Sequence, residues 1–549
     1  MQPNTAELST NPLSPLPEHW LSLGHAFIHQ ARSQPNAPCV ADSTGLVLNY
    51  HEALLGSIAL ANILHEKIGL AEYVGVLLPP SVAAALVNIA LTLLGKIPVN
   101  LNYTASQDSF NSYVSQCKLE HIITSNKVMQ RLSYESSATF LPVEALRKQV
   151  SLMVKARAWS EADLVPENLL GHFLPGLTQN HHHSRLDETA AILFTAGSTG
   201  DPKGVMLSHR NILSNIHAIQ QQARLSEKEV VLGVVPFFHS FGFTLTLWTV
   251  LTLGHSVIYH YDPRDARRIG DLCEKYKATV MFCTPTIMRS YLRRGKTEQF
   301  KSIKLCILGG EQLKPQLGKD IEQELGITAL EGYGLTETSP VVACNIPGEM
   351  ILSDGRRLPG NRPGTVGMPL PGTTVRIVGL TTGETLPTGE EGMILVTGPQ
   401  IMHGYLNKPE ETSKVMSGVW FATGDLGFLD QDGFLSITGR LSQFSKIGGE
   451  MVPHLAVEQE ILRITKAGEQ SLSVTSTPDD NRGERLVVLY TNLGMPPEEV
   501  VKQLRENDHL SNLWIPNVKD FIAVKELPVL STGKLDLRQI KNIAATPNC

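Results

Sequence analysis

Residues 192–211 read ILFTAGSTGDPKGVMLSHRN, and this stretch decides the fold class. An apolar, β-branched run enters a loop rich in glycine and hydroxyl groups, and helical spacing follows. Glycines let backbone N–H groups face a polyphosphate at close range, hydroxyls add donors, and a lysine adds positive charge. The loop therefore predicts a nucleotide phosphate site, with a plain glycine-rich turn as the alternative. The residues assigned to this site are Thr195, Gly197, Ser198, Thr199, Gly200 and Lys203.

The loop differs from the Walker A motif, which requires G-x-x-x-x-G-K-[ST]. The Gly-Lys-Thr of this chain lies at Gly295 to Thr297, and Ser290 stands where the first glycine of that motif belongs. The sequence therefore predicts a phosphate site of a different kind from that of the P-loop nucleotidases.

Short apolar runs alternate with helical stretches on both sides of the loop. Examples are YVGVLLPPS (73–81), IPVNLN (97–102), EHIITSN (120–126), VVLGVVP (230–236) and ATVMFCT (278–284). Strands that read as continuous apolar runs between helices are typical of parallel sheets covered on both faces. We therefore expect an α/β fold with a large, multi-layered N-terminal domain.

The pattern of apolar residues changes after Gly372. The segments TTVRIVG, MILVTG and FLSITGR are predicted to be shorter, alternating strands joined by glycine-rich turns. This pattern predicts a small barrel or a distorted sheet. A third, strand-rich region with the helical stretch PPEEVVKQLREN follows Arg440. We expect an N-terminal domain over residues 1–440 and a small, mobile α+β domain over 441–549, with a hinge near 440–443.

Composition excludes some functions. A formal net charge of -6 leaves no excess of Lys and Arg to contact a phosphate backbone, so no nucleic-acid partner is expected. The N-terminus has no signal-peptide pattern and the seven cysteines form no C-x-x-C pair, which fits a cytoplasmic protein. The uncharged run from Val230 to Gly254 is interrupted by Gly and Pro, which favours buried elements over a membrane span. The run His181 to His183 indicates a surface loop more than a metal site.

Further motifs follow the loop in a fixed order. They are VPFFHSFGF (235–243), LGGEQL (308–313), EGYGLTETSP (331–340), FATGDLGFLDQDGFLSITGR (421–440), KIGGEMV (446–452) and LSTGKLD (530–536). With the loop, they resemble the signatures of the acyl-adenylate-forming superfamily of AMP-dependent synthetases and ligases, over roughly residues 25 to 540. The resemblance implies activation of a carboxylic acid by ATP and Mg²⁺, followed by transfer of the acyl group to a thiol.

The resemblance assigns roles to individual residues. Tyr333 and Gly334 would lie on one side of the adenine, with a wall made by Gly309, Gly310 and Glu311 on the other. Thr336 would donate to a phosphate, and Glu337 would bind Mg²⁺, since a hard cation prefers carboxylate oxygen. The ribose and nearby phosphate would be contacted by Asp425 and Arg440.

The same resemblance assigns the residues of the acyl and transfer steps. The expected catalytic residues are Lys534, His239, Thr336 and Glu337. The ammonium of Lys534 would balance charge that develops at the α-phosphate, and His239 would line the acyl site. Lys446 is either a thiol-step residue or a surface charge. Two departures are Ala196, where Ser or Gly is usual, and Gln443 at the hinge, where Asp or Lys is commoner.

A closer resemblance rests on the segments VNLNYTASQ, PFFHSFGF, LEGYGLTETSPVV, GPQIMHGYL and SKIGGEMV. These segments are most similar to the acyl-carrier-protein synthetase half of the acylglycerophosphoethanolamine acyltransferases. This resemblance implies a long-chain fatty acid as substrate, acyl carrier protein as acceptor and a peripheral membrane contact. Two alternatives stay open: a fatty acyl-CoA ligase, and a non-catalytic nucleotide-binding module. Phe241 to Leu253 forms either an acyl-tunnel wall or a core helix. A basic stretch would either dock the acidic carrier or be a solvated face; it contains Arg293, Arg294, Lys296, Lys301 and Lys304.

Overall fold

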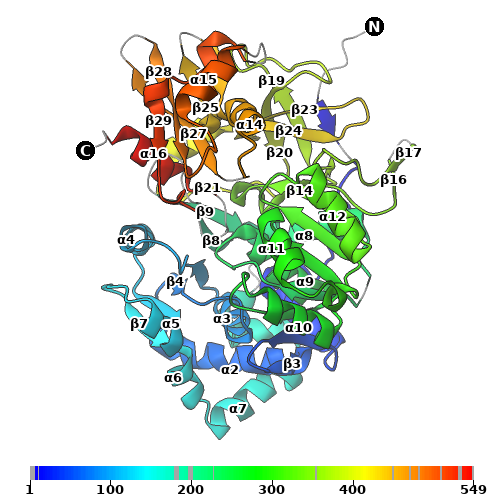
Figure 1. The fold of residues 1–549 in the computed structure, drawn as a ribbon. Coiled ribbons are helices and arrows are strands. Elements are labelled where there is room, and N and C mark those ends of the chain that lie inside the picture. Colours follow the sequence, from blue (N-terminus) through cyan, green and yellow to red (C-terminus); the bar gives the residue numbers. More distant parts are fainter. Residues whose placement is uncertain are drawn as a thin grey trace.

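The computed structural model contains two mainly parallel sheets with covering helices, an antiparallel sheet beside them and a C-terminal sheet at one end (Figure 1). A small antiparallel pair is formed by β16 (Glu349–Ile351) and β17 (Arg357–Pro359). This arrangement confirms the predicted α/β class. The structure describes residues 7–9, 11–178, 185–195, 202–226, 228–352, 355–447, 450–468, 471–479, 482–506, 510–529 and 535–546.

The larger parallel sheet has nine strands in the order β18-β15-β14-β13-β12-β10-β11-β2-β3. Neighbours from β14 to β2 are parallel, and the antiparallel strands lie at the two edges. The strands are β2 (Pro38–Asp42), β3 (Val47–Asn49), β10 (Val230–Gly233), β11 (Ser256–Tyr259), β12 (Val280–Cys283), β13 (Leu305–Gly309), β14 (Ala329–Gly334), β15 (Val341–Cys344) and β18 (Met368–Pro369).

The second sheet has seven strands in the order β21-β9-β8-β5-β4-β6-β7, and β8 to β7 are parallel neighbours. Strands β9 and β21 add to its other edge in antiparallel pairing. The strands are β4 (Tyr73–Val76), β5 (Ile97–Asn100), β6 (His121–Thr124), β7 (Thr139–Pro142), β8 (Thr189–Thr195), β9 (Lys203–Ser208) and β21 (Gly404–Tyr405).

Helices cover these sheets, and one extended apolar core joins both. Helix α2 begins in a capping box, in which Asn49 and Glu52 satisfy each other's backbone N–H groups. The helices of this part are α1 (Leu23–Ser33), α2 (Tyr50–Ile68), α3 (Val82–Leu93), α4 (Gln107–Gln116), α5 (Asn126–Arg131), α6 (Val143–Lys148), α7 (Leu152–Trp159), α8 (His209–Ala223), α9 (Thr249–Leu253), α10 (Ala266–Tyr276), α11 (Pro285–Arg294), α12 (Pro315–Leu325) and α13 (Pro409–Val415).

The uncharged run Val230–Gly254 folds as buried elements, as its interruptions predict. Strand β10 is followed by a turn, the π-helix η5 (Phe241–Trp248) and α9. Gly242 is needed where η5 begins, because a Cβ there would lie 2.3 Å from the carbonyl oxygen of Pro236. Within the described ranges, no helix has the length and apolar character that a membrane crossing requires.

A six-stranded antiparallel sheet contains the alternating strands after Gly372. Of the two forms expected, the structure shows a sheet with β1 and β22 at its ends, and β24 pairs with β23 beside that path. Among the described strands no pairing closes it into a barrel. Its strands are β1 (Glu7–Ser9), β19 (Thr374–Val378), β20 (Gly392–Thr397), β22 (Met416–Ser417), β23 (Trp420–Leu429) and β24 (Leu435–Arg440).

The C-terminal part has its own sheet and its own apolar clusters. A single 3-10 turn, η8 (Leu441–Gln443), separates β24 from this sheet. In Figure 1 these elements lie at the opposite end of the molecule from α6 and α7. They are β25 (Phe444–Ile447), β26 (Glu450–Pro453), β27 (Leu472–Asp479), β28 (Gly483–Tyr490), β29 (Phe521–Ala523), α14 (His454–Thr465), α15 (Pro497–Glu506) and α16 (Leu537–Ala545).

Candidate active site

The predicted phosphate loop connects two antiparallel strands. Thr195 at the end of β8 pairs with Lys203 at the start of β9. The intervening Gly197, Ser198, Thr199 and Gly200 lie outside the described residues. The sequence pattern predicts a helix directly after the loop, but α8 begins only at His209. The segment Lys203–Ser208 forms β9 because it pairs with β8 on one side and β21 on the other.

The ammonium of Lys203 lies in a charged cluster near the loop. Its Nζ is 3.0 Å from a carboxylate oxygen of Glu411 on α13, and 4.9 Å from the centre of the Tyr405 ring. Glu411 also contacts Lys414 at 2.5 Å. Lys414 first, and then Lys203, hold the pKa of Glu411 at about 2, so this carboxyl stays ionised. A bound phosphate would therefore compete with Glu411 for Lys203.

Glu337 is a buried carboxylate in the short 3-10 turn η7 (Thr336–Thr338). Its Oε1 accepts a 2.8 Å hydrogen bond from the Tyr405 hydroxyl, and its backbone oxygen accepts one from the N–H of Met402. Burial raises the pKa of Glu337, while Tyr405, Arg440 and Lys203 act to lower it. A cation beside this oriented carboxylate would offset the cost of burying its charge. The site therefore fits the predicted Mg²⁺ role of Glu337.

The turn before Glu337 is held by a close backbone contact. A Cβ on Gly334 would lie 1.9 Å from the carbonyl oxygen of Pro340, so any side chain at this position would force the turn apart. Leu335 donates its N–H to that same oxygen at 3.0 Å. This contact orients the half-buried Thr336, and it explains why glycine follows Tyr333.

Asp425 is contacted by two other predicted site residues, Tyr333 and Arg440. The Tyr333 hydroxyl donates to Oδ2 of Asp425 at 2.6 Å, and Nε of Arg440 lies 2.9 Å from Oδ1. Tyr333 ends β14, whereas Asp425 and Arg440 are directly paired on β23 and β24. The carboxylate is nearly buried and the Arg440 side chain is about half exposed. The structure thus places an acceptor carboxylate and a cation beside Tyr333.

The predicted adenine wall lies on the strand beside Tyr333. Gly309 of β13 is paired with Gly332 of β14, which brings the two segments together. The side chain of Glu311 does something that sequence analysis did not predict. Its Oε2 accepts hydrogen bonds from the N–H and hydroxyl of Thr286, at 3.1 and 2.7 Å, in the first turn of α11. A carboxylate there stabilises the helix N-terminus, so Glu311 positions the turn through α11.

Some predicted residues receive less support. His239 is half-buried just before η5, with its ring 4.4 Å from that of Phe238. Phe243 to Leu251, which spans most of η5 and the start of α9, lies largely within the main core, and this favours the core-helix interpretation of the run Phe241 to Leu253. Lys446 belongs to β25, but its side chain is outside the described part, as are Lys534 and His181 to His183. The basic stretch from Arg293 to Lys304 has exposed cationic side chains.

Two residues of this site were missed by sequence analysis. Tyr405 contacts both Glu337 and Lys203, and Glu411 pairs with Lys203. Tyr405 lies within the stretch GPQIMHGYL (398–406), whose β21 pairs with β9, and Glu411 follows that stretch on α13. The available signal was the single tyrosine of this stretch, just after a glycine. The site thus combines β9, the end of β14, β21 and the pair β23 and β24.

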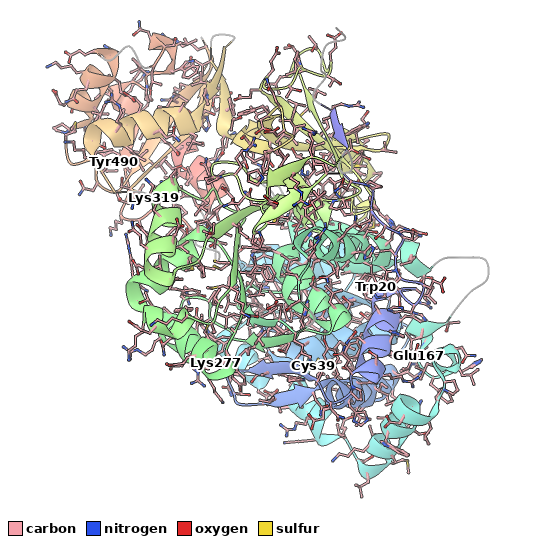
Figure 2. All side chains as sticks on the ribbon, turned by 90° about the vertical axis from the view of Figure 1, so that its right-hand side faces the viewer. Trp20, Cys39, Glu167, Lys277, Lys319 and Tyr490 are labelled. Atoms are coloured by element: carbon pink, nitrogen blue, oxygen red, sulfur yellow. The ribbon has the colours of Figure 1, made fainter. Side chains whose placement is uncertain are left out.

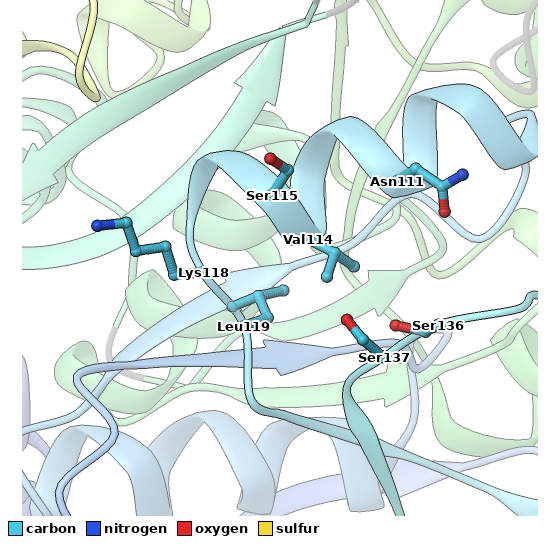
Figure 3. Close-up of a pocket in the computed structure, with 7 residues that line it drawn as sticks. All are labelled: Asn111, Val114, Ser115, Lys118, Leu119, Ser136 and Ser137. Atoms are coloured by element: carbon cyan, nitrogen blue, oxygen red, sulfur yellow. The ribbon is translucent and has the colours of Figure 1, made fainter.

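A separate hollow of about 430 Å³ opens beside α4 (Figure 3). It is lined by small polar and apolar side chains, and it contains none of the predicted site residues. The lining consists of Asn111, Val114, Ser115, Lys118, Leu119, Ser136 and Ser137. The side chains that line this hollow do not form a cluster of charged groups like those around Glu337 and Asp425.

Changing Tyr405 to Phe should weaken Mg²⁺-dependent nucleotide binding by about tenfold to a hundredfold. The change removes a hydrogen bond to a carboxylate, which contributes about 1.5–3 kcal/mol. Titration calorimetry with nucleotide at several Mg²⁺ concentrations measures this effect. Tyr134→Phe is the matched control, since that hydroxyl donates to the Ala105 carbonyl at 2.6 Å. Equal Mg²⁺ requirements in both variants would refute the role of Tyr405.

Comparison with known proteins agrees with this geometry. The profile of the family described as AMP-binding enzyme matches residues 27–406. A long-chain-fatty-acid–CoA ligase of Bacillus subtilis is 35% identical over 363 residues, which span 64% of this chain and 61% of that enzyme. The ligase of the same name from Salmonella typhimurium is 25% identical over 553 residues, with 96% and 95% covered.

Among solved structures, o-succinylbenzoate coenzyme A synthetase from Bacillus subtilis, in complex with ATP and a magnesium ion, superposes with a TM-score of 0.74. The alignment covers 95% of this chain and 99% of that one at 21% identity. At this identity the likeness establishes the fold alone.

Proposed function

We propose, since the chain belongs to the family of AMP-binding enzymes, that it activates a long-chain fatty acid with ATP and passes the acyl group to a thiol. The proposed acceptor is the phosphopantetheine thiol of acyl carrier protein. The observation that carries the proposal is the convergence of Lys203, Glu337 and Tyr405 with Tyr333, Asp425 and Arg440 in one site. The names of the two relatives support the fatty-acid substrate.

In this proposal, separate groups of residues bind the adenine, the ribose and the phosphates of the nucleotide. Tyr333 and the turn at Gly309 and Gly310 hold the adenine, while Asp425 accepts from the ribose hydroxyls. Thr195, Lys203 and the glycine loop contact the phosphates. A magnesium ion held by Glu337 would neutralise phosphate charge and orient the reacting groups. Tyr405 keeps that carboxylate in place.

The first step joins the acid to the nucleotide. An oxygen of the fatty carboxylate attacks the α-phosphorus, the bond to the β-phosphate oxygen breaks, and pyrophosphate leaves. Negative charge grows on the α-phosphate oxygens, and the ammonium of Lys534 stabilises it. The product is a mixed anhydride whose carbonyl carbon is reactive toward a thiol.

The second step transfers the acyl group. The acceptor sulfur, having lost its proton to solvent, attacks the carbonyl carbon, and AMP leaves with the electron pair of the broken bond. We propose that residues 1–440 and 441–549 act as two units that reorient between the steps. The separate apolar clusters of the C-terminal part and the short turn Leu441–Gln443 support this hinge. Lys534 would then serve the first step and Lys446 the second.

The acceptor is tested by pyrophosphate release with ATP, Mg²⁺ and palmitate, comparing holo-acyl carrier protein with coenzyme A. We expect turnover with the carrier protein, whose acidic surface would meet the exposed cations between Arg293 and Lys304. Turnover with coenzyme A alone would assign the second candidate, an acyl-CoA ligase, which the names of the relatives favour. If no pyrophosphate were released with palmitate or with any other acid tested, the chain would instead be a non-catalytic nucleotide-binding module.

Fatty acids partition into lipid bilayers, so the proposed function also includes a peripheral contact with a membrane. Such a contact requires a surface with exposed apolar and cationic side chains.

A further inference from the structure

Large apolar side chains are concentrated in one exposed segment of the chain. Of the sixteen large hydrophobic side chains that are exposed in the described part, six lie between Leu152 and Phe173. They are Leu152, Met153, Trp159, Leu164, Leu169 and Phe173. Single exposed apolar residues are normal on a soluble surface, but such clustering marks an interaction site.

Helix α7 presents this apolar surface to solvent. Ala158 is buried and Val154 half-buried, and these two lie four residues apart on the face that packs against the protein. At about 100° per residue, the opposite face contains Leu152, Met153 and Trp159. Their side chains are 85%, 82% and 49% exposed. In most surface helices the larger apolar residues face the core. In α7 they face the solvent instead.

Positive charge surrounds this face. From Ala145 to Ser160 the chain carries four basic side chains and no acidic one, although its overall charge is -6. Arg147 and Lys148 end α6, and Lys155 and Arg157 flank the outward face of α7. The combination of exposed apolar residues with flanking cations is complementary to an anionic lipid surface.

The nearest carboxylates are engaged with the protein. Glu161 is almost completely buried, and it accepts hydrogen bonds from Arg157 at 2.7 Å and from Asn62 at 3.0 Å. Asp163 lies 3.0 Å from the ring of His51. Glu144, in the first turn of α6, accepts a hydrogen bond from the N–H of Asn126 at 3.0 Å and offsets one of the charges of Arg147 and Lys148. Since Arg157 is balanced by Glu161, the surface retains a net positive charge from the remaining cations.

The segment forms one end of the molecule. In Figure 1, α6 and α7 lie at the lower end, with α2 just above them and the C-terminal elements at the far end. Figure 2 shows the same end in a second view, beside the labelled Glu167. A flat surface could therefore contact α7 without meeting the C-terminal part.

We propose that α7, with the end of α6, docks on an anionic lipid bilayer. The docking surface, here called the α7 surface, consists of Arg147, Lys148, Leu152, Met153, Lys155 and Trp159. The apolar side chains enter the boundary between headgroups and acyl chains, Trp159 lies at that boundary, and the three cations contact anionic headgroups. The inference extends the membrane contact of the proposed function, but its test needs no turnover, so the two can fail separately.

Flotation of the full chain with lipid vesicles tests the proposal. We expect binding to vesicles of equal parts phosphatidylglycerol and phosphatidylcholine, weak binding to pure phosphatidylcholine, and loss of binding at high salt. The triple change Leu152→Ser, Met153→Ser and Trp159→Ser should lower the partition coefficient by about tenfold or more. Binding should also shift the fluorescence of Trp159 to shorter wavelength, and Trp159→Phe should remove that shift.

Matched variants elsewhere serve as controls. Val419→Ser, Leu380→Ser and Ile351→Ser replace three other exposed apolar side chains and should leave binding unchanged. Arg147→Glu with Lys148→Glu should weaken binding, whereas Arg293→Glu with Arg294→Glu should not.

Three results would overturn the proposal: no flotation with phosphatidylglycerol vesicles, equal binding by the α7 triple variant and its control, or a fluorescence shift that Trp159→Phe leaves intact. A dimer that dissociates only in the α7 triple variant, measured by light scattering without lipid, would instead assign the surface to a second copy of the chain. An unchanged melting temperature in circular dichroism shows that a variant is folded.

Discussion

Replacing Lys534 by Ala should lower the rate of acyl-adenylate formation by about a hundredfold to a thousandfold. The proposed role of its ammonium is to stabilise charge that develops at the α-phosphate, and removing one such group costs about 2.7–4 kcal/mol of transition-state stabilisation. Transfer from a preformed acyl-adenylate to the thiol should be much less affected, because Lys534 serves only the first step. Rapid-quench measurement of each half-reaction separates the two effects.

Lys525→Ala is the matched control for this change. Lys525 is an exposed lysine of the same C-terminal part, nine residues before Lys534. It should leave both half-reactions unchanged. If Lys534→Ala slowed both half-reactions equally, or neither, the assignment of Lys534 to adenylate formation would be wrong.

Replacing Glu337 by Gln should weaken Mg²⁺ binding in the nucleotide complex by about a hundredfold, since it removes the one charged ligand assigned to the cation. Burial raises the pKa of Glu337, so the carboxyl retains its proton to a higher pH than an exposed glutamate does. Mg²⁺ must displace that proton, and its affinity in the wild type should therefore rise with pH. In Glu337→Gln this part of the pH dependence should vanish. Calorimetric Mg²⁺ titrations at a series of pH values measure both effects.

Glu331→Gln provides a control from the same motif. Glu331 is also buried, its pKa is raised to about 7 by burial, and its Oε1 accepts from the N–H of Leu313 at 2.9 Å. This variant should retain the Mg²⁺ affinity of the wild type and its pH dependence. A wild-type affinity that does not change with pH, or a loss in Glu331→Gln as large as in Glu337→Gln, would contradict the magnesium role.

Much of the fold was predictable because its strands are short apolar runs bounded by turn residues. The runs at 230–236 and 278–284 became β10 and β12, and the alternating strands after Gly372 became an antiparallel sheet. The sequence did not distinguish a barrel from an open sheet, because the apolar pattern of a strand does not specify which other strand it pairs with. Strand β9 was missed for a similar reason, since its pairing with β21 joins residues about 200 positions apart.

The proximity of candidate site residues was predictable where a motif fixes both residue type and spacing. Tyr333, Asp425 and Arg440 meet as expected, although more than 90 positions separate the first two. Side-chain partners outside a motif were not predictable. Tyr405 orients Glu337, Glu411 neutralises Lys203, and the carboxylate of Glu311 caps α11. Each of these contacts depends on the packing of separate elements.

The proposed chemistry is tested most directly by exchange of radiolabelled pyrophosphate into ATP, with palmitate and Mg²⁺ but without any thiol. Reversible formation of an acyl-adenylate predicts exchange that requires palmitate and is abolished in Glu337→Gln. Exchange that proceeds without palmitate, or with short acids but never with a long-chain one, would contradict a fatty-acid-activating site.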